Sequence, residues 1–201
     1  MQISAEDCDA IGVALNEAIL HGVEVDPERR VVGVTLEIRA LPAEGSPPAD
    51  ARVQVLLRPV GRIAAALLRG ASDSPDAKVV PFAIEELPER VDSVPGGGIY
   101  GWKFVDVHEE QLRWWGSKLS LDWRSGEDGL SHSLYLFKDL DANSELDLLI
   151  WFDSFRIFTP DFREIEFADF LAGGRRWWEA FRANDPRTAG HGLVPLREPD
   201  A

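Results

Sequence analysis

The chain has 201 residues, 45% of them hydrophobic and 28% charged, which is an ordinary globular composition that needs no disulfide or metal staple. Its 35 acidic and 21 basic residues give a formal charge of −14, so we expect neither nucleic acid nor a membrane surface among its partners. The single cysteine, Cys8, and an acidic N-terminal segment where a secretory signal would be basic favour the cytoplasm.

The first predicted element is a helix over residues 5–20. Ser4 is a suitable N-cap, and Asp7 follows three residues later, as in a weak capping box. Gly22 supplies a C-terminal stop. One apolar stripe recurs at helical spacing and consists of Cys8, Ile11, Leu15 and Ile19.

Four strands are predicted next, at residues 31–40, 52–58, 60–68 and 78–85. The first alternates between apolar and polar residues, as a half-buried strand does. Pro59 and Gly61 are expected to separate the second from the third. The third is alternatively a short helix, because Ala64 begins a run of three alanines. Pro81 removes a donor from the fourth, which places it at a sheet edge.

The second half contains all seven tryptophans and nine of the ten phenylalanines, so most of the aromatic packing is expected there. Strands are predicted at residues 100–107, 118–124, 133–138 and 146–158. The last two are apolar on both faces at Leu134–Phe137 and Leu148–Phe152, which is typical of strands covered on both sides. We expect these two to be central strands, joined as an antiparallel pair by the acidic loop 139–147.

A final helix is predicted over residues 168–183, with an apolar stripe that includes Trp177 and Trp178. The whole pattern predicts an α+β fold: a mostly antiparallel sheet, or a two-layer β arrangement, of about eight strands with both helices covering one face or one end. We expect a single domain over residues 1–183, whose halves 1–94 and 99–183 are joined by a Gly-rich linker, and a loosely ordered tail at 184–201.

Residues 34–40 and 119–125 keep the same residue classes at a shift of 85, which suggests an internal duplication. Two amphipathic strands also align this well without common origin, and both interpretations stay open here.

The acidic loop resembles the start of a calcium-binding loop, because oxygen ligands occupy alternate positions at Asp139, Asp141, Asn143, Glu145 and Asp147. Ser144 replaces the glycine of the sharp turn, and Ile150 replaces the closing glutamate. A solvated turn that discourages aggregation of an apolar hairpin explains the same residues.

Asp106 and His108 are two residues apart and would share one face of a strand, where His132 could join them around a transition metal. The helical HExxH spacing is absent, and no nucleophile elbow is present. The alternative is a strand end with charged loop residues. We expect no bound cofactor.

Two adjacent tryptophans, Trp114 and Trp115, lie in a polar stretch and could form a stacking platform, with Trp102 and Trp123 as further binding residues. The alternative is that they fold back over the sheet edge.

Three functions remain possible from the sequence. The first is a bacterial cytoplasmic binding or interaction protein without catalysis, since arginine outnumbers lysine as in GC-rich bacterial genomes and no catalytic motif is found. The second is a small-molecule-binding β domain with a Trp-lined pocket. The third is a metal-assisted hydrolase using Asp106, His108 and His132. The expected partner is an unidentified protein or small molecule.

Overall fold

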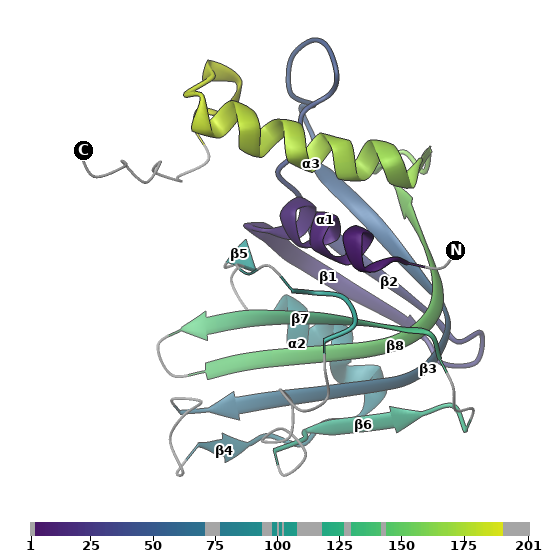
Figure 1. Ribbon diagram of the computed structural model, residues 1–201. Helices are drawn as coiled ribbons and strands as arrows, with labels where there is room; N and C mark the ends of the chain where they lie inside the picture. Colours follow the sequence, from purple (N-terminus) through teal and green to yellow (C-terminus); the bar gives the residue numbers. More distant parts are fainter. Residues whose placement is uncertain are drawn as a thin grey trace.

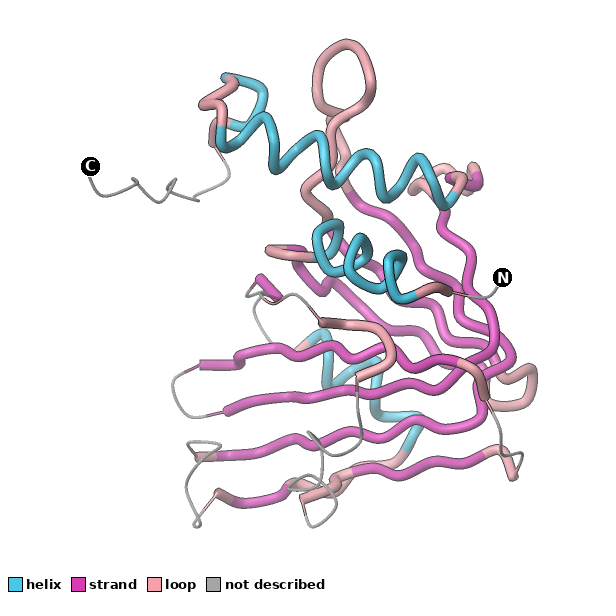
Figure 2. Tube along the Cα trace, viewed as in Figure 1, coloured by secondary structure: helices cyan, strands magenta, loops and turns pink. Residues whose placement is uncertain are grey.

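The computed structural model describes residues 3–70, 77–93, 98–99, 101, 103–107, 118–126, 130–141 and 144–190, without the side chains of 139–141. These residues form one antiparallel sheet of nine strands with three helices (Figures 1 and 2). The helices are α1 (Ala5–Leu15), α2 (Leu87–Asp92) and α3 (Phe167–Arg182). The strands are β1 (Ala18–Asp26), β2 (Val31–Glu37), β3 (Arg52–Arg69), β4 (Lys78–Val79), β5 (Gly98–Ile99), β6 (Leu121–Arg124), β7 (His132–Asp141), β8 (Ser144–Phe158) and β9 (Glu164–Ile165). The predicted α+β class is therefore confirmed.

The sheet has the strand order β5-β1-β2-β3-β8-β7, with β4 and β6 also paired to β3 and β9 paired to β8. The two long strands β3 and β8 pair along most of their length, from Gln54 with Phe158 to Arg69 with Ser144. A register shift between Val60 and Arg62 interrupts this pairing. The other neighbours of β3 and β8 change at this irregularity, which divides the sheet into two parts.

We call the part beneath the helices the helix half: residues 52–58 of β3 and 152–158 of β8, together with β1 and β2. The other part is the hairpin half: residues 62–69 of β3 and 144–151 of β8, together with β6 and β7. Figure 1 shows α1 and α3 over the helix half, with β7, β8, β3 and β6 side by side below them.

Both strands of the hairpin were predicted to be central, but only β8 is, because β7 is the last strand in the order of the described sheet. The predicted antiparallel pair is confirmed, because Leu134 of β7 lies opposite Ile150 of β8 and Leu136 lies opposite Leu148. These four side chains face the main core. The opposite face of the hairpin half is also buried, by a second cluster of Ala64, Ala66 and Leu149. Burial on both faces explains why alternation is lost in these segments.

The N-terminal helix is shorter than predicted, since it ends at Leu15 and not at residue 20. Strand β1, which the sequence did not predict, begins at Ala18 and pairs with β2. A register shift between Leu20 and Gly22 leaves His21 as an extra residue, so the strand buries Leu20 and then Val23. This bulge breaks the two-residue period that would have revealed the strand.

Two further expectations in the first half were wrong. Strand β3 is continuous through Pro59, where two separate strands were predicted. The predicted strand at 78–85 extends only over Lys78–Val79, and the chain then forms a 3₁₀ turn and α2. Pro88 lies in the first turn of α2, where a missing N–H costs nothing, and Glu86 accepts the backbone N–H of Ala83 before it.

The segment predicted as a strand at 100–107 forms only a single bridge between Val105 and Leu134 in its described residues. The backbone of Phe104 accepts the N–H of Tyr135, and Asp106 donates to the carbonyl of Ser133. Asp106 itself has a positive φ of 53°, which is uncommon outside glycine.

Helix α3 matches the predicted range within one residue at each end. Trp177, Trp178 and Phe181 pack against one another and against Leu41. Gly174 lies against α1, where an added Cβ would be 2.6 Å from the Cα of Ala14. The glycine therefore permits the close packing of α3 on α1.

Strands from both halves of the chain share this sheet. The suggested repeat is not reflected in the pairings, because β2 and β6 both pair with β3. No helix in the described ranges has the length and hydropathy needed to cross a bilayer.

Candidate functional site

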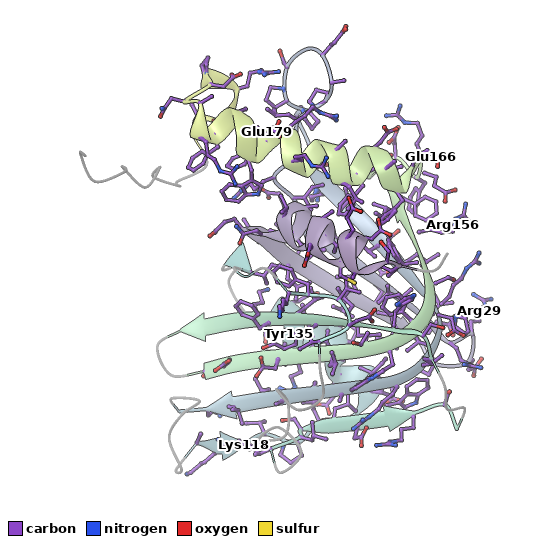
Figure 3. All side chains as sticks on the ribbon, in the orientation of Figure 1. Arg29, Lys118, Tyr135, Arg156, Glu166 and Glu179 are labelled. Atoms are coloured by element: carbon purple, nitrogen blue, oxygen red, sulfur yellow. The ribbon has the colours of Figure 1, made fainter. Side chains whose placement is uncertain are left out.

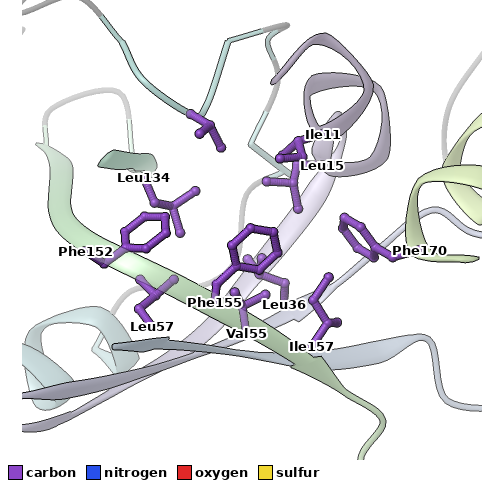
Figure 4. A pocket seen from close by; sticks show the side chains of 11 residues that line it. Ile11, Leu15, Leu36, Val55, Leu57, Leu134, Phe152, Phe155, Ile157 and Phe170 are labelled. Carbon is purple, nitrogen blue, oxygen red and sulfur yellow. The ribbon is translucent and has the colours of Figure 1, made fainter. Parts of the chain in front are cut away.

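An apolar cavity of about 30 Å³ lies between α1, α3 and the helix half of the sheet (Figure 4). Helix α1 contributes Ile11 and Leu15 to its wall, and α3 contributes Phe170. Figure 4 shows these side chains and Phe155 pointing toward one another. The rest of the wall comes mainly from the sheet and includes Leu36, Val55, Leu57, Phe152 and Ile157. Every described residue that lines the cavity is apolar, so a water molecule inside would find no hydrogen-bond partner among them.

The cavity exists because α1 is positioned by α3. The backbones of the two helices approach closely at Ala14 and Gly174, and the indole of Trp178 donates to the carbonyl of Val13. On the sheet side, Phe155 packs edge-on against Phe152 and Phe167. These contacts fix both walls, so the space between them cannot close without moving a helix.

Polar groups gather beside the cavity where segment 103–107 meets β7. Asp106 follows Val105, which lines the cavity, and its carboxylate accepts three hydrogen bonds, from Ser133, His132 and Cys8. The Ser133 N–H donates to Oδ1 at 2.8 Å, and His132 Nδ1 lies 2.9 Å from Oδ2. The imidazole ring of His132 is 6.0 Å from the ring of Phe152, which also lines the cavity.

Both ring nitrogens of His132 are engaged. The backbone N–H of Ile3 donates to Nε2 at 3.3 Å, so Nε2 acts as an acceptor and Nδ1 carries the proton given to Asp106. Only the neutral imidazole can make this pair of contacts. His132 is almost fully buried, and it joins the segment before α1 to the start of β7.

The thiol of Cys8 lies 4.0 Å from Oδ2 of Asp106. Burial, and then the negative charges of Asp106, Asp7 and Asp9, raise the pKa of this thiol above its usual range. A nucleophilic cysteine needs the opposite shift, because the thiolate is the reactive form. Since Nε2 of His132 is also occupied, the hydrogen bonds of this cluster join the segment before α1, helix α1, Asp106 and the start of β7.

The structure brings together two of the three residues predicted for a metal site, Asp106 and His132, while His108 lies outside the described residues. Within the described ranges no group of three or more His, Cys, Asp or Glu side chains could hold a metal ion.

The acidic segment proposed for calcium is strand-like in its backbone. Asp139 lies opposite Glu145, and Asp141 lies opposite Ser144. Asn143 is outside the described residues.

Three of the four predicted binding tryptophans, Trp102, Trp114 and Trp115, also lie outside the described residues. Trp123 lies opposite Ile63 in the hairpin half and packs, partly buried, against the main core. It does not line the cavity described above.

Sequence reasoning missed the cavity because each lining residue resembles an ordinary core residue. Ile11 and Leu15 were identified as part of an apolar stripe, but no sequence pattern shows that a gap remains between this stripe and the sheet. Searches of family models, curated proteins and solved structures returned no match to this chain, so its function has to be inferred from this geometry.

Proposed function

We propose that this protein is a non-catalytic binding protein that takes the apolar end of a small ligand into the cavity between α1, α3 and the sheet. The observation that carries the proposal is the wholly apolar lining of the cavity by side chains from α1, α3 and the sheet. Each methylene group transferred from water into such a wall contributes about 0.8 kcal/mol. A cavity of about 30 Å³ holds only the end of a chain or the edge of a ring, and the remainder of the ligand lies at its mouth.

The polar cluster supports binding over catalysis. The thiol of Cys8 is held protonated by burial and neighbouring carboxylates, and His132 uses both nitrogens in structural hydrogen bonds. A single free thiol also suits a reducing cytoplasm, which is where we place the protein.

Isothermal titration with 1-octanol tests the proposal. Val55→Leu adds one carbon to the cavity wall and is expected to weaken octanol binding about fourfold, since it removes room for about one methylene group. Val53→Leu is the matched control, because Val53 lies two residues away on the same strand, is buried and does not line the cavity. Equal affinities for both variants and the unaltered protein would contradict the proposed site.

A second candidate function, docking to a partner protein, is favoured by the turn between β8 and β9. Phe162 is 77% exposed and has a φ of 60°, which is uncommon for a bulky residue. Thr159 fixes the turn, since its N–H donates to Arg163, its carbonyl accepts from Phe162, and its hydroxyl accepts from the Arg163 N–H. A rigid turn that presents an aromatic ring can anchor a protein interface.

Affinity capture from a lysate of the source organism tests this second candidate. The unaltered chain and Phe162→Ser are compared under identical conditions. A protein retained by the first and lost with the second supports docking through Phe162, whereas identical retained sets contradict it.

A further inference from the structure

We infer that the ligand of the cavity carries a positively charged head group, of the alkylammonium class, which the carboxylate of Asp106 holds beside the cavity. This inference rests on the proposed function. Its basis is the position of one carboxylate next to residues of an apolar wall, and the way in which its described neighbours leave its charge uncompensated.

Three neighbours connect Asp106 to residues that line the cavity. It directly follows the lining residue Val105. Its partner His132 packs beside the lining residue Phe152, and its neighbour Cys8 lies one helical turn before the lining residue Ile11. A chain end in the cavity and a head group at this carboxylate therefore belong to one short amphiphilic molecule.

Within the part of the chain that the structure describes, the negative charge of Asp106 is oriented but not neutralised. Its three hydrogen-bond donors are the backbone N–H of Ser133, the neutral ring of His132 and the thiol of Cys8, and none of them carries a charge. Among the described residues, no lysine or arginine forms an ion pair with it. Its side chain is 37% exposed, so a head group can approach it from solvent.

The charge of Asp106 sets the preference among head groups. Its carboxylate would repel an anionic head group and attract an ammonium group. A neutral hydroxyl group would gain neither effect.

The experiment compares three probes with the same eight-carbon chain, octylammonium, 1-octanol and octanoate, by titration calorimetry at pH 7 and low salt. We expect octylammonium to bind about two- to fivefold more tightly than octanol, as a partly exposed ion pair allows, and octanoate to bind most weakly. In Asp106→Asn, the affinity ratio of octylammonium to octanol should fall to about one. Retained octanol binding in this variant shows that the cavity is intact.

The charge-matched control is Glu179→Gln, which removes one negative charge from the exposed side of α3. Glu179 is nine residues beyond the lining residue Phe170, or about 13 Å along the helix. Figure 3 shows it far along α3 from Glu166. The octylammonium preference should survive in this variant, which separates a local contact from general attraction to an acidic protein.

The outcomes are distinct. Equal affinity for the three probes overturns the head-group inference and leaves the proposed function standing. A preference that survives in Asp106→Asn, or falls equally in Glu179→Gln, overturns the assignment to Asp106. If no probe binds, both proposals fail.

Should Asp106→Asn not fold, a salt titration of the unaltered protein decides. The preference for octylammonium over octanol should decline when salt rises from 0.05 to 0.5 M, because salt screens the charge of the carboxylate. A salt-independent preference overturns the inference.

Discussion

The two halves of the β3–β8 pair use the same two strands but fill their surroundings differently. The hairpin half is covered on both faces, and its outer cluster is built on the small side chains of Ala64 and Ala66 against Leu149. The helix half faces α1 with larger side chains such as Phe152 and Phe155, and a cavity still remains. The difference follows from the position of α1, which covers the helix half. Because α1 packs closely on α3, it cannot move nearer to the sheet and fill the cavity.

The largest expected effect tests that helix contact. Gly174→Ala places a Cβ 2.6 Å from the Cα of Ala14, so the two helices must separate, and we expect the free energy of unfolding to fall by about 2–3 kcal/mol. Urea denaturation measures the change.

The neighbouring Gly173→Ala is its control. A Cβ there meets the side chain of Ala40 at 3.4 Å, and both substitutions improve helix propensity equally. A similar loss of stability in both variants would show that α1 is not held by the close approach at Gly174.

A smaller effect, about 1–3 kcal/mol, is expected for His132→Leu. The substitution leaves the N–H of Ile3 without its acceptor and the carboxylate of Asp106 without one donor. Amide hydrogen exchange should become faster in α1 and stay unchanged in the buried part of β8 in the hairpin half. Equal acceleration in both regions would contradict a local role for this contact.

The elements that were predicted correctly are those whose burial produces a regular pattern of apolar residues in the local sequence. The hairpin of β7 and β8 was predicted from unbroken apolar runs, and α3 from one broad stripe. Strand β1 was missed because the bulge at His21 shifts its period, and α2 because six residues are too few for a helical pattern. The cavity could not be predicted, because it depends on the distance between α1 and the sheet. That distance is set by the contact of Ala14 with Gly174, two residues that are 160 positions apart in the sequence.

A gain of about 0.5–1 kcal/mol in the free energy of unfolding is expected for Phe162→Gly, in the turn between β8 and β9. Glycine adopts a φ of 60° without steric cost, and the exposed ring contributes little packing. Thermal unfolding compares this variant with Phe162→Ser, which keeps the strained φ and should show no gain. A loss of stability in Phe162→Gly would indicate that the ring packs against the protein.

The smallest expected effect is a difference in pH dependence between the two halves. Burial lowers the pKa of Lys138, whose Nζ donates to the carbonyl of Val91 in α2, from 10.5. The stability linked to this group is complete above pH 10.5 and is lost as pH falls through the lowered pKa. Lys138→Met should therefore remove a component of stability that rises with pH in this alkaline window.

Cys8 should behave in the opposite sense. Burial raises the pKa of its thiol above 9.0, so the stability linked to it is complete below pH 9.0 and is lost as pH rises through the raised pKa. Denaturation of the unaltered protein and Cys8→Ala between pH 8 and 10.5 measures this component as a difference. The same slope in both proteins would show that the thiol is not buried beside Asp106 in solution.

The central claim is that the cavity between α1, α3 and the sheet binds an apolar ligand. Methyl-resolved NMR during a titration with 1-octanol tests it most directly, since the methyl groups report on each face of the sheet separately. We predict shifts for the cavity-lining methyl groups of Ile11, Leu36 and Val55, and none for Ala64, Ala66 and Leu149 on the outer face of the hairpin half. Shifts confined to the outer face, or no saturable shifts in the cavity, would contradict the account.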